Sequence, residues 1–266
     1  MSAKPAHLAP RYGAQFGDRS VAAAYRTRPP YPEEVFALVE SLLPEPRASR
    51  LLELGCGSGD LTLGLAPRVG AIDAVEISAA MLEVARARAG GGVANVRWIE
   101  SSAEAFAPDS RYALAVAAES LHWMDWDVVL PRLARWLEPG APLAIVDCRL
   151  LEPVPWQDEL ARLISTHSTN RDFQRLDLVQ ELTRRGLFRE LGRQRTAPVA
   201  LDQSVDDYVE SFHSRNGFSR ERMTPASAGE FDGGVRAAVA PWAREDRIAA
   251  RYSALVVWGR PTSPPA

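Results

Sequence analysis

The sequence predicts an α/β protein with a doubly wound, mostly parallel sheet, and two observations support this prediction. Short apolar, strand-like segments alternate with helical segments between residues 50 and 149, and this spacing favours βαβ units. The first strand-like segment also runs directly into a glycine-rich stretch, LLELGCGSGD, from Leu51 to Asp60. In open parallel sheets, a turn of this kind at the carboxyl end of a strand lies beside the ligand crevice.

The segment before the first strand is expected to be irregular up to residue 34 and then helical. Pro29, Pro30 and Pro32 precede a helical pattern over Glu33–Leu43. Proline is favourable at a helix start, because its missing N–H would have no partner there in any case.

The alternating elements then follow in chain order. Strands are predicted over Arg50–Leu54, Ala71–Val75, Val96–Ile99, Ala113–Ala117 and Leu143–Val146, and helices over Leu61–Ala66, Ala79–Ala89 and Asp127–Leu137. Ser78 is expected to cap the second of these helices, and the glycines at 90–92 to end it. The third helix is amphipathic, and Glu138-Pro139-Gly140 stops it.

The chain becomes less regular after Asp147. The remaining predicted elements are a helix over Leu178–Leu187, a strand around Arg195–Ala200, a helix over Val205–His213 and a strand over Tyr252–Trp258. We expect one domain over residues 1–266, with a core at about 35–149, 178–200 and 250–260. The segments at about 1–34, 150–177 and 201–249 exceed a minimal fold of this kind and are expected to form a lid.

Composition narrows the possible partners. The chain has 266 residues, a formal net charge of −3 and only two cysteines. The acidic balance disfavours nucleic acid as the main partner, and two cysteines form neither a disulfide framework nor a four-ligand zinc site. With no signal-like start and no apolar run of membrane-spanning length, the expectation is a cytoplasmic protein without membrane contact. His122 and Asp125 alone do not make a metal site, so none is expected.

The glycine stretch indicates the kind of ligand. A dinucleotide fold requires G-x-G-x-x-G, and here Asp60 stands where its third glycine belongs. A ligand with an amino-acid end and a nucleoside end fits better. Glu53 could hold an ammonium group, the loop N–H groups a carboxylate, and Glu76, which ends the second strand, a ribose. The alternative is a tight strand-to-helix turn that binds nothing.

The segment ELGCGSG, with an acid ending the next strand, resembles the class I S-adenosylmethionine-dependent methyltransferases. LHWMDW, followed by LARWLEPGAPLAIVD, is similar to their small-molecule branch, which includes trans-aconitate and quinone-biosynthesis methyltransferases. The resemblance implies a Rossmann-like, seven-stranded, mostly parallel sheet with its last strand antiparallel, plus helical lid segments. It also implies S-adenosyl-L-methionine as cofactor.

The resemblance places the cofactor residue by residue. The methionine part is expected beside Glu53, Gly55, Cys56, Gly57 and Gly59. Glu76 is expected to bind the ribose, and Ile77 and Met81 to pack near the adenine. Ser102 stands where relatives carry an acid for the adenine amino group, with Ala103 and Glu104 after it, and a hydroxyl is a weaker acceptor than a carboxylate. Tyr25, Arg28 and Glu119 complete the expected cofactor-binding set.

The methyl acceptor is expected to lie beside the segment 118–123. His122 is the candidate general base by position, with a purely structural role as the alternative, and Trp123 is a candidate apolar wall. The lid stretches ISTHSTNRDF and YVESFHSRNGF add candidate substrate contacts, although each could equally be a solvated polar turn. These lid candidates are His167, Asn170, Arg171, His213 and Arg215.

The predicted function is S-adenosylmethionine-dependent methyl transfer to oxygen or carbon of a small organic molecule, such as a carboxylate or hydroxyl of a metabolite. The Asn/Asp-Pro-Pro-Tyr/Phe motif of amide and base N-methylators is missing after the fourth strand, which disfavours those reactions. The alternatives are a methyltransferase acting on RNA or protein, and a protein that binds the cofactor without chemistry. The sequence leaves the acceptor and the oligomeric state open.

Overall fold

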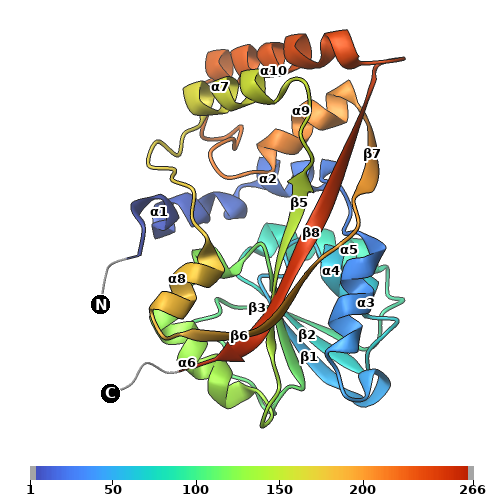
Figure 1. Ribbon diagram of the computed structural model, residues 1–266, viewed down its shortest axis with the longest axis vertical. Helices are drawn as coiled ribbons and strands as arrows, with labels where there is room; N and C mark the ends of the chain where they lie inside the picture. The colour runs from blue at the N-terminus through green and yellow to red at the C-terminus, as the bar shows by residue number, and fades with distance from the viewer. Residues whose placement is uncertain (1–3, 263–266) are drawn as a thin grey trace.

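One sheet forms the centre of the computed structural model, which describes residues 4–262, the side chains at 149 and 150 excepted (Figure 1). Its strands are β1 (Arg50–Leu54), β2 (Ala71–Glu76), β3 (Val96–Glu100), β4 (Leu114–Ala118), β5 (Leu143–Leu151), β6 (Phe188–Arg195), β7 (Val199–Ser204) and β8 (Arg247–Pro261). The strand order is β3-β2-β1-β4-β5-β8-β6. Strands β1 to β5 pair in parallel, and β8 is antiparallel to its neighbours. The predicted fold class is confirmed.

The carboxyl-terminal strands are longer and more numerous than the sequence indicated. β8 has 15 residues, and two strands share one of its edges. β6 pairs with its second half and β7 with its first half, so β7 is an eighth strand beside the seven of the main order. The single strand expected around Arg195–Ala200 is wrong, because that range covers the junction between the two. β6 is a mostly exposed edge strand, FRELGRQR, whose side chains carry little apolar periodicity.

Ten helices are described. They are α1 (Pro10–Gly13), α2 (Arg19–Ala24), α3 (Glu33–Ser41), α4 (Asp60–Leu65), α5 (Ala79–Ala89), α6 (Trp126–Trp136), α7 (Gln157–His167), α8 (Leu178–Arg184), α9 (Val205–His213) and α10 (Pro225–Val239). The predicted cap of α5 is confirmed, since the Ser78 side chain accepts the Met81 N–H at 3.2 Å. The predicted bounds of α9 are confirmed as well.

Helices cover both faces of the sheet, and the alternation of side chains along β1 shows this directly. Leu51 belongs to the buried cluster beneath α3, α4 and α5. Leu52 belongs to the cluster on the opposite face, with α6 and α8. Because successive side chains of a strand point to opposite faces, one apolar run supplies both layers.

Three further helices form a layer of their own above the carboxyl ends of the strands (Figure 1). We call α7, α9 and α10 the lid helices. They share a separate hydrophobic cluster around Phe212 and Phe231, both fully buried. Helix α10 was not predicted, because its sequence PASAGEFDGGVRAAV contains three glycines and a weak apolar stripe.

The N-terminal segment is ordered into short helical turns, which corrects the expectation of an irregular start. Val21 and Ala22 of α2 pack on Met81 of α5. The segment thereby crosses the carboxyl edge of the sheet beneath the lid helices (Figure 1). Short turns of this kind depend on docking, because a helix of six residues is not stable alone.

A buried carboxylate in β2 gives a test of the core. Asp73 is 3% exposed and accepts hydrogen bonds from Arg50, Arg97 and Tyr112 at 2.5–2.9 Å. Removing it leaves the buried Tyr112 hydroxyl unpaired, whereas Arg50 and Arg97 are partly exposed and can turn to water. We therefore expect Asp73→Ala to lower the free energy of unfolding by about 1–3 kcal/mol. Urea denaturation measures this. Asp109→Ala is the matched control, because Asp109 contacts the same two arginines but is 59% exposed; an equal loss in both variants would contradict the account.

Candidate active site

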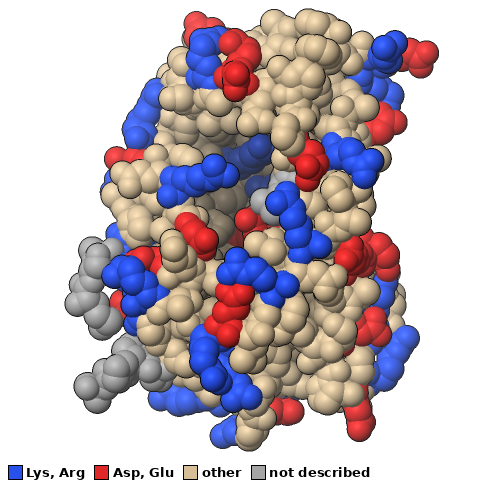
Figure 2. Space-filling view, in the orientation of Figure 1, with Lys and Arg blue, Asp and Glu red and all other residues tan. Residues whose placement is uncertain are grey.

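A cavity of about 900 Å³ lies at the carboxyl ends of β1, β2 and β4. The molecular surface is hollowed between the lid helices and the sheet (Figure 2). The cavity walls come from the glycine loop, the ends of the strands and the N-terminal segment. Of the cofactor residues expected from the sequence, those lining the cavity are Tyr25, Arg28, Glu53, Gly55, Cys56, Gly57, Glu76, Ile77, Met81, Ser102, Ala103, Glu104 and Glu119.

The glycine loop turns its backbone towards the cavity. Gly55 and Gly57 have φ angles of +74° and +54°, which side-chain-bearing residues rarely adopt. A Cβ at Gly55 would lie 2.4 Å from the Ser120 Cβ, so glycine is also required for the close approach of the chain after β4. The Gly57 N–H donates to Glu76 at 2.9 Å, which fixes the loop against β2.

Gly59 does not line the cavity and therefore departs from the expectation. It is the N-cap of α4 with φ +79°. A Cβ there would lie 2.8 Å from the Trp98 ring and 3.2 Å from the Ala85 Cβ. Because Gly59 has no side chain, the loop can pack closely against α5 and β3.

Glu76 presents a preorganised carboxylate at the end of β2. One of its oxygens accepts the Gly57 N–H and the other the Ser78 N–H, both at 2.9 Å. Burial raises its pKa, and these backbone donors oppose that rise. The Ile77 N–H acts on the same carboxylate, and a carboxylate has about four lone-pair sites, so Glu76 can still accept a hydroxyl hydrogen from a ligand.

Glu53 lies deeper, at the end of β1. It is 1% exposed, and the Thr62 hydroxyl donates to it. Burial raises the pKa of Glu53 to about 8, and the nearby Asp60 and Glu76 contribute to the rise. A positively charged ligand group would favour the ionised form.

Cys56 lines the cavity too, and burial raises the pKa of its thiol well above the usual value, which makes it a poor nucleophile.

The side of the cavity beyond β2 and β3 has an apolar wall and a polar turn. Ile77 is 68% exposed while lining the cavity, and Met81 is buried beside it. Ser102 accepts the Ala105 N–H at 3.1 Å, so its lone pairs partly serve the turn. Glu104 accepts the Asp125 N–H at 2.7 Å.

The N-terminal segment closes the cavity from above, and Arg28 ties it to the rest of the molecule. The Arg28 guanidinium lies 4.1 Å from the Tyr25 ring centroid. It donates to the Ser214 hydroxyl and carbonyl at 2.8 and 2.7 Å, and lies 3.4 Å from Glu119. One side chain thus connects the N-terminal segment, the C-cap of α9 and the turn after β4.

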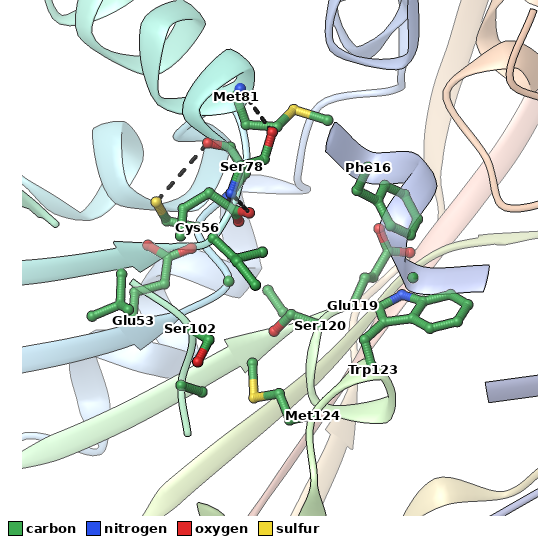
Figure 3. A pocket seen from close by; sticks show the side chains of 18 of the residues that line it. Phe16, Glu53, Cys56, Ser78, Met81, Ser102, Glu119, Ser120, Trp123 and Met124 are labelled. Carbon is green, nitrogen blue, oxygen red and sulfur yellow. Dashed lines mark hydrogen bonds between the residues drawn. The ribbon is translucent and has the colours of Figure 1, made fainter. Parts of the chain in front are cut away.

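The chain after β4 brings Glu119 and Trp123 to the far end of the cavity (Figure 3). Glu119 has φ +52°, one of three described residues other than glycine with a positive φ. The Ser120 hydroxyl donates to the Leu54 carbonyl at 2.6 Å and anchors the turn. Trp123 packs on Phe16 of the N-terminal segment, with ring centroids 5.5 Å apart. The sequence did not indicate Phe16, because its segment was expected to be irregular.

The structure does not place His122 in the wall of the cavity. Its ring packs beside Trp123 at 4.8 Å. Burial lowers the pKa of His122 to about 4, although Glu119 opposes the shift. An imidazole with that pKa is a weak base, and the role of His122 as general base stays a prediction.

The five lid candidates also lie outside the cavity wall and have structural contacts. His213 is fully buried between the Phe218 carbonyl and Asp232, at 2.7 Å each. Asn170 donates to the His7 carbonyl and to Asn216. His167 contacts Ser227, and Arg215 stacks on Phe212. Arg171 donates to two carbonyls of α7. The lid helices hold the N-terminal segment, and that segment faces the cavity.

Residues 51–140 match a family model described as a methyltransferase domain, and this range contains the glycine loop, Glu76 and Glu119. An uncharacterized methyltransferase of Mycobacterium tuberculosis is 35% identical over 145 residues, which is 54% of this chain and 57% of that protein. A putative type II methyltransferase from Anaeromyxobacter dehalogenans superposes with a TM-score of 0.59 at 25% identity, covering 90% of this chain and 99% of that one.

The similarity to methyltransferases therefore includes the part of the chain that forms the glycine loop and the ends of β2 and β4. The chain spans little more than half the length of that curated relative. Its fold is also shared with a Geobacter sulfurreducens methyltransferase in complex with S-adenosyl-L-homocysteine, with a TM-score of 0.51 at 20% identity over 95% of this chain and 98% of that one.

Within residues 4–262, no three His, Cys, Asp or Glu side chains gather as a metal site would require. Nor does any helix in that range combine the length and the apolar character needed to cross a membrane.

Proposed function

We propose that this chain binds S-adenosyl-L-methionine in the cavity and transfers its methyl group to a small organic molecule. One observation supports this most strongly: two buried carboxyl groups, Glu53 and Glu76, face the same cavity from successive parallel strands, with the glycine loop between them. A ligand with an ammonium at one end and a ribose beyond it matches this order.

The residues present fit the cofactor. Glu53 would pair with the ammonium, since a buried carboxyl gains most from a positive partner. Glu76 would accept a ribose hydroxyl with the lone pair that its backbone contacts leave. Gly57 permits direct contact with the main chain, because it has no side chain to fill the space towards Tyr25. Ile77 and Met81 would flank the adenine.

The cofactor, when bound, supplies a methyl group bonded to a positively charged sulfur. The chain contributes position and exclusion of water, which account for much of the rate in transfers of this type. The N-terminal segment covers the cavity, and Arg28 holds it to Ser214 and Glu119. The covered cavity and the net charge of −3 favour a small molecule over RNA or a protein as acceptor.

Isothermal titration of the full chain tests the proposal. We expect S-adenosyl-L-homocysteine to bind with one site and NADH to give no heat of binding. A cooperative unfolding transition shows that the chain is folded. If the folded chain binds NADH but not S-adenosyl-L-homocysteine, the proposal is overturned. Binding of S-adenosyl-L-homocysteine without methylation of any compound in a broad acceptor panel would favour a cofactor-binding protein without chemistry.

A further inference from the structure

The cavity extends beyond Glu76 to the turn that follows β3. The strand order β3-β2-β1 places the carboxyl ends of these three strands side by side. A ligand with its ammonium at Glu53 on β1 and its ribose at Glu76 on β2 therefore brings its base to the turn after β3. Residues 101–104 of this turn line the cavity, and we call them the base turn.

Lys4 lies close to the base turn, although it comes from the N-terminal segment. It lines the same cavity, and its ammonium donates to the Met124 carbonyl at 2.9 Å. The next residue is tied to the base turn, because the Asp125 N–H donates to Glu104 at 2.7 Å. We propose that Lys4 donates a hydrogen bond to a ring nitrogen of the adenine and so recognises the base of the cofactor. This inference rests on the proposed function and adds a recognition residue to it.

The Lys4 ammonium has two unused donors. An ammonium carries three N–H bonds, and within residues 4–262 the Met124 carbonyl is the only group that accepts one. Burial lowers the pKa of Lys4 to about 8, although Asp125 and Glu104 oppose the shift. Both acids accept backbone N–H groups instead, Glu104 from Asp125 and Asp125 from Asp127. A buried ammonium with unused donors gains from an acceptor that a ligand brings.

An aromatic ring holds the Lys4 side chain in this position. Its Nζ lies 5.2 Å from the centroid of the Trp126 ring, within the range of a cation–π contact. The ring is itself fixed, because Trp126 is 2% exposed and its indole N–H donates to the Leu121 carbonyl at 2.8 Å. An ammonium held in this way is preorganised, so it loses little freedom when a ligand binds.

Adenine offers the acceptors that this ammonium needs. The adenine amino group donates and N7 accepts, and N1, on the other side of the amino group, also accepts. Because an ammonium has donors only, Lys4 can bond N1 or N7 but not the amino group. The Ser102 hydroxyl accepts the Ala105 N–H at 3.1 Å and keeps a second lone pair, which can take an amino hydrogen. The base turn and Lys4 together match the edge of adenine that carries the amino group.

The contact would also connect the cofactor to the segment that covers it. Lys4 lies near one end of the N-terminal segment and Arg28 near the other. Arg28 is already fastened to the Ser214 hydroxyl and carbonyl. When adenine is bound, the Lys4 end gains a contact that the free chain does not make, so the segment closes more firmly over the occupied cavity.

Analogues of S-adenosyl-L-homocysteine that lack one ring nitrogen test this. In the 1-deaza, 7-deaza and 3-deaza forms, a C–H group replaces N1, N7 or N3. Isothermal titration measures the affinity of each for the wild-type chain and for Lys4→Met. We expect the loss of affinity on removing N1 or N7 to be at least about fivefold larger in the wild type than in Lys4→Met. N3 lies on the opposite edge of the base, so its removal should cost both chains equally.

This coupling to one ring nitrogen is a readout that a merely structural role of Lys4 would not change. Arg11→Met is the matched control, because Arg11 lies on the same segment, pairs with Asp172 at 2.6 Å and does not line the cavity. Its losses should equal those of the wild type. Equal losses in the wild type and Lys4→Met for all three analogues would overturn the inference alone. If the folded wild-type chain does not bind S-adenosyl-L-homocysteine, the proposed function fails and this inference fails with it.

Discussion

Gly57→Val is expected to weaken the binding of S-adenosyl-L-homocysteine by at least about 100-fold, or about 3 kcal/mol. Two physical reasons add together. A Cβ at this position would lie 3.6 Å from the Tyr25 ring, in the space through which a ligand approaches the main chain. A β-branched residue also resists the φ of +54°, so the loop would shift and the Gly57 contact to Glu76 would be lost. Isothermal titration measures the change.

The matched control for this loss is Gly90→Val. Gly90 has φ +55° at the end of α5, and a Cβ there would meet nothing within 4 Å. The two variants therefore share the backbone strain and differ in their position relative to the cavity. Similar binding by both variants would show that the ligand does not approach the glycine loop.

The affinity for S-adenosyl-L-homocysteine is expected to rise with pH, by about tenfold per unit between pH 5.5 and 7.5. In the free chain, burial raises the pKa of Glu53 to about 8, so this carboxyl is protonated over that range. The ligand ammonium pairs with the ionised form, which lowers the pKa in the complex. Binding therefore releases a proton, and higher pH favours it. Titration in buffers of different ionisation enthalpy counts the protons released.

Glu53→Gln isolates this effect, because glutamine has nearly the same shape but no proton to release. Its affinity should be low and almost independent of pH between 5.5 and 7.5. Burial also raises the pKa of Glu76, so any slope that remains in Glu53→Gln reports that second group. A wild-type slope that persists unchanged in the variant would remove Glu53 from the site of the ammonium.

The part of the fold that local signals specify could be predicted from the sequence. β1, the glycine turn, β2 and the capped helix α5 follow from an apolar run, glycines and Ser78, all of which act within a few residues. The edge strands β6 and β7 could not be predicted in this way. Their partner is β8, which lies far along the chain, and long-range pairing decides where each of them ends.

The site residues likewise fall into those that local sequence signals predict and those that depend on tertiary packing. Glu53 is the next-to-last residue of β1 and Glu76 is the last residue of β2, so the parallel sheet alone brings them to one edge. The structural contacts of the lid residues could not be predicted, for a tertiary reason. His213 has Asp232 as its partner, and no local pattern shows that α9 and α10 pack together around it. The wall above the cavity comes instead from Phe16 and its neighbours, whose short turns exist only when docked on α5.

A crystal structure of the chain with S-adenosyl-L-homocysteine tests the account most directly. The account predicts the ammonium beside Glu53, a ribose hydroxyl on Glu76, and the sulfur facing the end of the cavity formed by Phe16, Glu119 and Trp123. A ligand bound outside this cavity, or one with its ribose away from Glu76, would contradict it.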